Sequence, residues 1–318
     1  MKIILFSLLL TIGLMAEVAT TPKITICQQE KVIKNGWTDT NKTLNQAIIK
    51  LAKEEIPNII KKLSKPLSPD ANKSDIYNLP KVNLTRDDYI KLFAYSKYLE
   101  HIGKKELVLS FYIESLKGVH NIKNTSLLAA IFRLVINNII TNSMRHSLEQ
   151  KKFTKKDKLY LYNKLSKLLI LDNYYIVSAI QSEKKINNQQ INMMKSNKDN
   201  EKYLEVYKKE FQKINTEYWD VLLNAIKMNN LSEAHKHEEQ KLSKLQFWNT
   251  LKLFFLDTKI TFYKKIGISL SKKDYITYAK YSALKTLLIT RPKLYKTCQD
   301  YLNMIYNNKK LLKRLSEQ

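Results

Sequence analysis

The sequence has few residues that break or turn a chain. Among its 318 residues only 5 are Gly and 6 are Pro, and three of the prolines, Pro66, Pro69 and Pro80, lie in one short stretch. An all-β protein needs turn residues every few positions, so this scarcity argues against one. Hydrophobic residues make up 44% of the chain, which is enough for a core and excludes a disordered basic tail. The composition therefore predicts long helices.

Cysteine is also scarce. The two cysteines, Cys27 and Cys298, lie near opposite ends of the chain. In an oxidising compartment such a pair can form a disulfide. The other interpretation is that both are unpaired small hydrophobic residues, and Cys298 fits this too, because it shares a helical stripe with Leu294, Leu302 and Ile305. The sequence leaves both interpretations open.

Arginine is rare in a strongly basic chain. The formal net charge is +26, but only 5 of the 55 basic residues are Arg. Arg is the residue that reads base edges bidentately, whereas these lysines are spread over every segment amid many Asn, Ile and Tyr residues. An A+T-rich coding sequence tends to produce this mixture. We therefore expect solvated helix faces with attraction for anionic partners rather than a nucleic-acid-binding protein.

The first residues resemble an export signal. Lys2 is followed by an uncharged run from Ile3 to Met15, and Glu17 ends it. This run is shorter than the about 20 apolar residues that a membrane-spanning helix needs. Ala16 is the kind of small residue that signal peptidase accepts before its cut. We expect cleavage after Ala16 and a periplasmic or secreted protein without a transmembrane helix; the alternative is an uncleaved N-terminal anchor.

The rest of the chain reads as helices in antiparallel pairs. The predicted fold class is all-α, a multi-helix bundle or a short irregular α-solenoid. After the signal peptide at 1–16 we expect an N-terminal helical segment at 17–63, interrupted at Pro57. A proline-containing connector at 64–84 and a helical body at 85–318 follow, with a joint near 187–199. The last two helices are predicted at 272–289 and from Pro292 to about 315.

One local pattern occurs three times. Thr85, Thr154 and Ser271 each precede an Asp by three positions. A Ser or Thr hydroxyl at the start of a helix accepts a hydrogen bond from the backbone N–H three residues on, and the acidic side chain can reach back. We interpret these pairs as helix starts rather than as catalytic Ser/Asp pairs.

The first of these starts leads into a stretch, 89–118, that resembles one tetratricopeptide-type helical hairpin. Gly103 matches the turn glycine of that family, Val108 its small apolar position, Tyr112 its aromatic position and Ser115 the small residue of the second helix. The aromatic residue of the first helix is displaced, and no second copy follows at the family's period. The resemblance implies helix pairs that stack to present a protein-binding groove.

No group of residues carries recognisable catalytic or metal-binding chemistry. His235 faces Glu238 and Glu239 on a helix, but a zinc site needs at least three protein ligands. The segment that starts at His237 begins like the zinc-protease motif, but Lys241 stands where that motif requires its second His. We expect no metal and no cofactor. Tyr95, Tyr112, Tyr160, Tyr278 and Tyr301 lie on apolar stripes and are expected in the core, although an aromatic groove for a sugar or peptide is an alternative.

The sequence thus predicts an exported, non-catalytic binding or scaffold protein of the cell envelope, which engages a protein partner or an anionic envelope component. The alternative is an envelope enzyme whose site is assembled from distant residues. The basic segment 307–315 is expected to be the docked end of the last helix. The other interpretation places it on an anionic membrane with Leu311, Leu312 and Leu315 inward.

Overall fold

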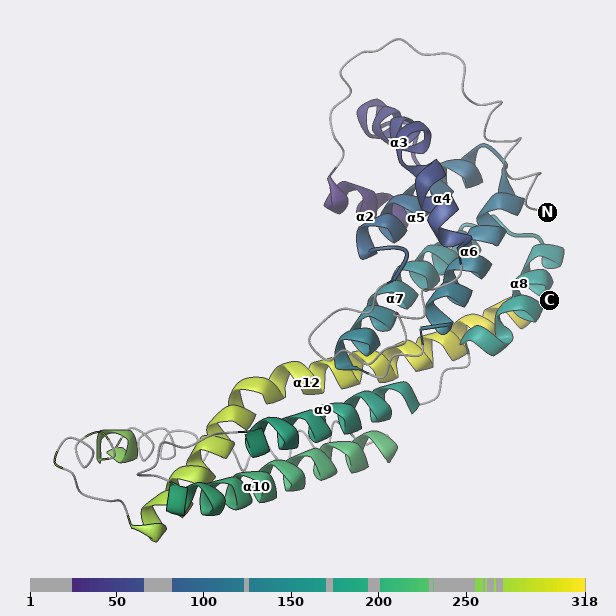
Figure 1. The fold of residues 1–318 in the computed structure, drawn as a ribbon. Coiled ribbons are helices and arrows are strands. Elements are labelled where there is room, and N and C mark those ends of the chain that lie inside the picture. The colour runs from purple at the N-terminus through teal and green to yellow at the C-terminus, as the bar shows by residue number, and fades with distance from the viewer. Residues whose placement is uncertain are drawn as a thin grey trace. The chain divides into compact units, whose positions relative to one another are not determined.

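The computed structural model describes residues 25–65, 82–122, 126–169, 174–193, 201–228, 231, 255–259, 261, 266 and 271–317. These residues form helices and no strand, which confirms the all-α class (Figure 1). The predicted signal peptide at 1–16 and most of the predicted connector, 66–81, lie outside the described residues.

The chain divides into two compact units. Unit 1 comprises three stretches, 1–124, 131–171 and 304–318, and unit 2 comprises 125–130 and 172–303. Two helices therefore contribute to both units: α7 (Leu127–Glu149) and α12 (Lys272–Ser316).

Unit 1 begins with three short helices, α2 (Ile26–Asn35), α3 (Lys42–Glu54) and α4 (Ile56–Leu63). A capping box starts α2: the Thr25 side chain accepts from the backbone N–H of Gln28, and the Gln28 side chain accepts from that of Thr25. Pro57 lies in the first turn of α4, where its missing N–H removes no helical hydrogen bond. The break predicted at this proline is therefore the start of a new helix.

The next pair of helices, α5 (Arg86–His101) and α6 (Lys105–His120), forms the predicted hairpin. Thr85 caps α5 in a complete capping box with Asp88, and equivalent hydrogen bonds join Thr154 to Asp157 and Ser271 to Asp274. All three predicted helix starts are confirmed. Gly103 turns the chain between the helices at φ +76°, a conformation that L side chains rarely adopt.

α7 is the most apolar of the described helices. By length and composition it is the one described helix that could cross a membrane, and 56% of its apolar window is buried inside the protein. Length and composition do not separate a membrane helix from the core helix of a helical unit. Its side chains Ile136, Ile140 and Met144 belong to the core of unit 1.

α8 (Lys155–Leu169) and the final turns of α12 complete unit 1. α8 packs against α6 and buries Leu161, Leu165 and Leu169. Leu311, Leu312 and Leu315 of α12 are buried in the same core. This confirms that segment 307–315 is the end of a docked helix, and the interpretation that placed these three leucines in a membrane is wrong.

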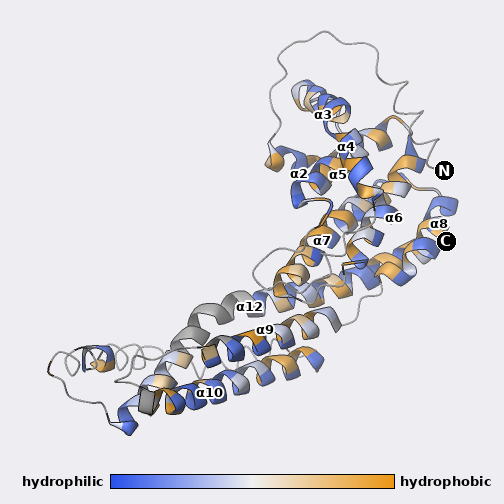
Figure 2. Cartoon of the chain, in the orientation of Figure 1, coloured by the Kyte–Doolittle hydropathy of each residue, from blue (hydrophilic) through white to orange (hydrophobic). Residues whose placement is uncertain are grey.

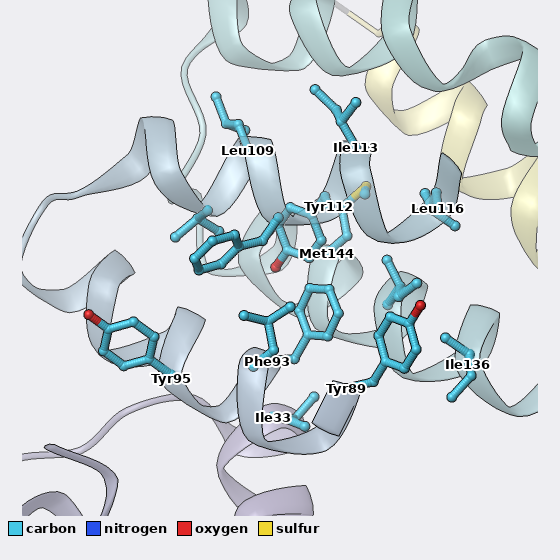
Figure 3. Close-up of a cluster of buried hydrophobic side chains, with 14 of the residues drawn as sticks. Ile33, Tyr89, Phe93, Tyr95, Leu109, Tyr112, Ile113, Leu116, Ile136 and Met144 are labelled. Carbon is cyan, nitrogen blue, oxygen red and sulfur yellow. The ribbon is translucent and has the colours of Figure 1, made fainter. Parts of the chain in front are cut away.

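The core of unit 1 is one cluster of side chains to which α2, α5, α6, α7, α8 and α12 all contribute. Figure 3 shows Ile33 of α2, Phe93 of α5, Tyr112 of α6 and Met144 of α7 meeting in it. The rings of Phe93 and Tyr112 stack with their centroids 5.4 Å apart, and Phe153 meets Tyr112 edge-on at 6.2 Å. Hydrophobic stripes on these helices alternate with hydrophilic faces, as Figure 2 shows.

Unit 2 contains α9 (Tyr174–Met193), α10 (Glu201–Lys227) and the first part of α12. α9 and α10 lie side by side (Figure 1), and Lys184 of α9 donates to Asp220 of α10 at 2.7 Å. Ile191, Phe211 and Ala283, one from each helix, share an apolar cluster. α9 continues to Met193, so the polar run at the predicted joint begins inside a helix.

α12 is a single helix of 45 residues, so the predicted break between 289 and 292 is wrong. Pro292 lies inside it, although a proline within a helix removes one backbone hydrogen bond and its ring crowds the carbonyl four residues earlier. No glycine occurs in this stretch of the sequence, and glycine is the residue that most readily ends a helix.

The three described glycines make a matched set for testing backbone strain. Gly103→Ala should reduce the free energy of unfolding by about 1 kcal/mol, because φ is positive but no atom lies within 4 Å of the added methyl group. Gly36→Ala should cost more, about 2–3 kcal/mol, since its φ is +84° and a β-carbon would lie 2.6 Å from Cε1 of His146. Gly118→Ala, within α6, should stabilise by up to about 1 kcal/mol.

Urea unfolding followed by circular dichroism measures the three differences. A Gly36→Ala variant as stable as Gly118→Ala would contradict the close contact between the α2 turn and α7.

Candidate functional site

A network of polar side chains is buried where α5, α6 and α7 meet. Lys97 and Glu100 of α5 form an ion pair with Nζ–Oε2 3.2 Å, and their side chains are only 1% and 4% exposed. Tyr112 of α6 donates to Glu100 at 3.2 Å, and Ser143 and Ser147 come from α7. The network therefore ties three helices together through hydrogen bonds inside an otherwise apolar core.

Lys97 and Glu100 both have hydrogen-bond partners for their buried polar atoms. The Lys97 ammonium has three protons, and its acceptors are the Glu100 carboxylate, the backbone oxygen of Ser143 at 2.8 Å and Oγ of Ser147 at 2.5 Å. Oε1 of Glu100 also accepts from the Ser147 hydroxyl. Burial lowers the pKa of Lys97, and the Glu100 carboxylate opposes this shift.

The short distance between Ser147 and Lys97 resembles that of a nucleophile and its general base. A serine can be activated by a neutral lysine within hydrogen-bond reach. Here, however, the ammonium is paired with Glu100, and Ser147 has no exposed surface. A substrate has no access to this hydroxyl in the structure, so the arrangement stabilises the fold rather than presenting a reactive group.

His146 lies between this network and the turn after α2. Its ring contacts the backbone at Gly36, and the Asn35 backbone forms a hydrogen bond with it. Burial lowers the pKa of His146 from its usual value of 6.5, and the charge of Lys97 lowers it further, while Glu100 and Glu149 act in the opposite direction. Folding therefore weakens the binding of a proton to His146.

Beyond this turn, Trp37 forms an aromatic cluster with α5. Its ring lies 5.0 Å from that of Tyr98 and stacks at 6.0 Å on His101. The Asp39 carboxylate accepts from the Trp37 indole N–H and lies 3.3 Å from Nε2 of His101. The cluster fastens the α2–α3 turn to α5.

An open pocket of about 290 Å³ lies between α4, α5, α6 and α7 in unit 1. Lys62, Lys65 and Lys117 line it, together with the buried Tyr89 side chain of α5. Carboxylates offset part of this positive charge. Glu114 pairs with Lys117 at 2.8 Å, and Asp88 lies 3.8 Å from Lys62. The pocket suits a small polar molecule, and its charge does not select strongly for an anion.

The two cysteines that the sequence singled out are both free thiols in the structure. Cys27 is exposed on α2, and Cys298 is fully buried in α12. Burial raises the pKa of the Cys298 thiol to about 12, so this thiol is unreactive. The two residues belong to different units. The disulfide stays a prediction.

Of the other residues considered from sequence, His235, Glu238 and Glu239 lie outside the described residues. Within the described part of the chain no group of three or more His, Cys, Asp or Glu side chains could hold a metal ion. Tyr112 and Tyr301 are buried as expected, but Tyr160 is 46% exposed, so its assignment to the core is wrong. The reason is that Leu161, one position on, occupies the inner stripe of α8.

Lys97, Glu100, Ser143 and Ser147 were not identified from the sequence. One local signal was available: Lys97 and Glu100 lie three positions apart on the stripe of α5 that also carries Phe93. Charged residues on an apolar stripe indicate a buried pair or a functional site. Their serine partners lie 46 to 50 positions away and give no local signal.

Comparison with known proteins found no match to a protein-family profile, to a curated protein or to a solved structure.

Removing one partner of the buried ion pair should have a large effect on stability. Lys97→Met should reduce the free energy of unfolding by about 3–5 kcal/mol, because it leaves the Glu100 carboxylate buried without its cation. The double variant Lys97→Met/Glu100→Gln should cost clearly less than the sum of the two single changes. The matched control is Lys117→Met, which breaks the exposed pair with Glu114 and should cost no more than about 1 kcal/mol. Additive single and double changes in urea unfolding would contradict coupling between Lys97 and Glu100.

His146 gives a pH-dependent prediction. Because its pKa is lower in the folded than in the unfolded chain, the unfolded chain binds the proton more tightly. The contribution of neutral His146 to the stability of the fold is therefore complete above the usual pKa of 6.5. It is lost as the pH falls towards the lower pKa of His146 in the folded chain. Urea unfolding at about pH 7.5 and about pH 5.5 should show a larger loss of stability for the wild type than for His146→Gln. Equal losses in the two proteins would contradict this assignment.

Proposed function

We propose that this chain is an exported, all-helical binding protein of the cell envelope, which engages a protein partner or an anionic envelope component without catalysing a reaction. The observation that carries the proposal is the closed Lys97–Glu100–Ser147 network. The side chains of the described residues that are best arranged for nucleophilic chemistry are buried, paired and inaccessible. A catalytic group must touch its substrate, and the described partners of these groups are all groups of α5, α6 and α7.

The distribution of charge supports binding. The formal net charge is +26, and lysines occupy the exposed faces of the described helices of unit 1. A positive surface attracts anionic partners and raises the rate of association with them. The pocket between α4 and α7 adds a place for a small polar group of such a partner.

The enzyme alternative would require the buried network to open. In that case Ser147 would be the nucleophile and Lys97 the base, since their Oγ and Nζ atoms are 2.5 Å apart. The enzyme alternative requires Ser147 for catalysis but not the neighbouring Ser143. Ser143 also contributes a buried hydroxyl to the network, through Tyr112 at 3.0 Å, but no hydrogen bond joins its Oγ to Lys97 among the described contacts.

The test measures turnover and binding with the same purified protein. We expect no release of product from cell-wall glycan or polyphosphate, and saturable, salt-sensitive binding to isolated envelopes. Ser147→Ala and Ser143→Ala should leave envelope binding unchanged and serve as matched variants. Turnover that Ser147→Ala abolishes and Ser143→Ala retains would replace the binding function with the enzyme alternative.

A further inference from the structure

The outer face of α8 combines positive charge with exposed apolar side chains. The inner face of this helix is fixed by Leu161, Leu165 and Leu169, which are buried in the core of unit 1. With 3.6 residues per turn, the side of α8 opposite these leucines points outward. We call these outward residues the basic face of α8: Lys155, Lys156, Leu159, Tyr160, Lys164 and Lys167.

Within the described part of unit 1, no carboxylate forms an ion pair with the lysines of this face. Asp157 is the one acidic residue of α8, and it caps the start of the helix by accepting from the Thr154 backbone N–H at 2.9 Å and from its hydroxyl at 2.8 Å. The turn that precedes α8 adds two more exposed lysines, Lys151 and Lys152. The positive charge at this end of unit 1 is therefore concentrated on one helix face and the turn leading into it.

The final turn of α12 brings further positive charge to the same region. Arg314 donates to Glu149 at 3.0 Å, and Glu149 ends α7 two residues before Lys151. The contact uses the carboxylate at the end of α7 and leaves the adjacent Lys313 exposed. Leu311, Leu312 and Leu315 at the end of α12 belong to the same core cluster as the buried leucines of α8.

Leu159 and Tyr160 lie at the centre of the basic face. Leu159 is 58% exposed and Tyr160 46% exposed, and Nζ of Lys164 lies 5.9 Å from the centre of the Tyr160 ring. Single exposed apolar residues are common on protein surfaces. Two adjacent ones surrounded by lysines form a combination that an anionic membrane interface can accommodate, because lysines contact headgroups there and apolar side chains enter the acyl boundary.

We propose that the basic face of α8 is a docking surface for an anionic lipid membrane. The lysines attract the headgroup phosphates, while Leu159 and the Tyr160 ring insert between the headgroups. This inference rests on the proposed function and names the anionic envelope component as lipid. A nucleic acid would attract the same lysines, but it offers no apolar layer for Leu159, and α8 contains no Arg to read bases.

Co-sedimentation with vesicles of phosphatidylglycerol and phosphatidylcholine tests the proposal on the full chain. Wild-type protein should bind the anionic vesicles and not pure phosphatidylcholine. Replacing Lys155, Lys156, Lys164 and Lys167 with Gln should weaken binding roughly 600-fold, since each of the four lysines near an anionic surface contributes roughly fivefold. The matched control replaces Lys31, Lys34, Lys53 and Lys61 with Gln, which removes the same charge from α2, α3 and α4, and should weaken binding much less.

A second variant separates membrane insertion from charge attraction alone. Leu159→Gln/Tyr160→Gln keeps every lysine and should still weaken binding to anionic vesicles, at least severalfold, without changing binding to a soluble DNA duplex. Circular dichroism of each variant confirms that it is folded. Equal losses in the α8 and control lysine variants would overturn the proposal. So would full vesicle binding by the Leu159/Tyr160 variant together with tight binding of DNA, which would make the face a polyanion site.

The outcomes also separate this inference from the proposed function. Wild-type protein that ignores anionic vesicles but binds another envelope component saturably would overturn the membrane surface and leave the binding function intact. Wild-type protein that binds neither would overturn both.

Discussion

The ion pair between Lys97 and Glu100 is the constraint on which unit 1 depends. A charge in an apolar core is tolerated only when its partners are in place, so α5, α6 and α7 must adopt one relative position to supply them. Apolar contacts such as those of Phe93 and Met144 hold the helices together but accept small shifts between them. The polar network therefore favours the packing of the three helices in which all of these groups are paired.

Short sequence patterns predicted the features that depend only on neighbouring residues, above all the starts of helices. Thr85, Thr154 and Ser271 each sit three positions before the Asp with which they cap a helix, and the structure contains all three caps. α2, which was not predicted as a helix of its own, carries the same kind of signal in Thr25 and Gln28. Proline predicted the ends of helices less well. α12 continues through Pro292, whereas Pro57 lies in the first turn of α4. The start of a helix is determined by the few residues around it, whereas the continuation of a helix depends on the residues that pack against it.

The candidate sites could not be predicted in the same way. Ser147 is 50 positions from Lys97, and only the packing of α7 on α5 brings them together. Tyr160 is likewise exposed because the side of α8 that packs on the core carries Leu161. Neighbouring residues differ by a rotation of only about 100° around the helix axis, so the sequence alone does not decide which of the two is buried. Unit 1 thus buries Ser147 together with Lys97 and leaves its other described lysines exposed or half-exposed, an arrangement that suits a surface that binds.

The core of unit 1 receives Leu311, Leu312 and Leu315 from a stretch that comes long after α8 in the chain. A protein is synthesised from its N-terminus. α2 to α8 are therefore made before the three leucines that cover part of their apolar surface. The residues of unit 2 that follow α8 must all be synthesised before Leu311, Leu312 and Leu315 can join the core. The core of unit 1 can therefore be completed only after that intervening segment has been made, and until then its uncovered apolar positions are exposed to chaperones and to aggregation.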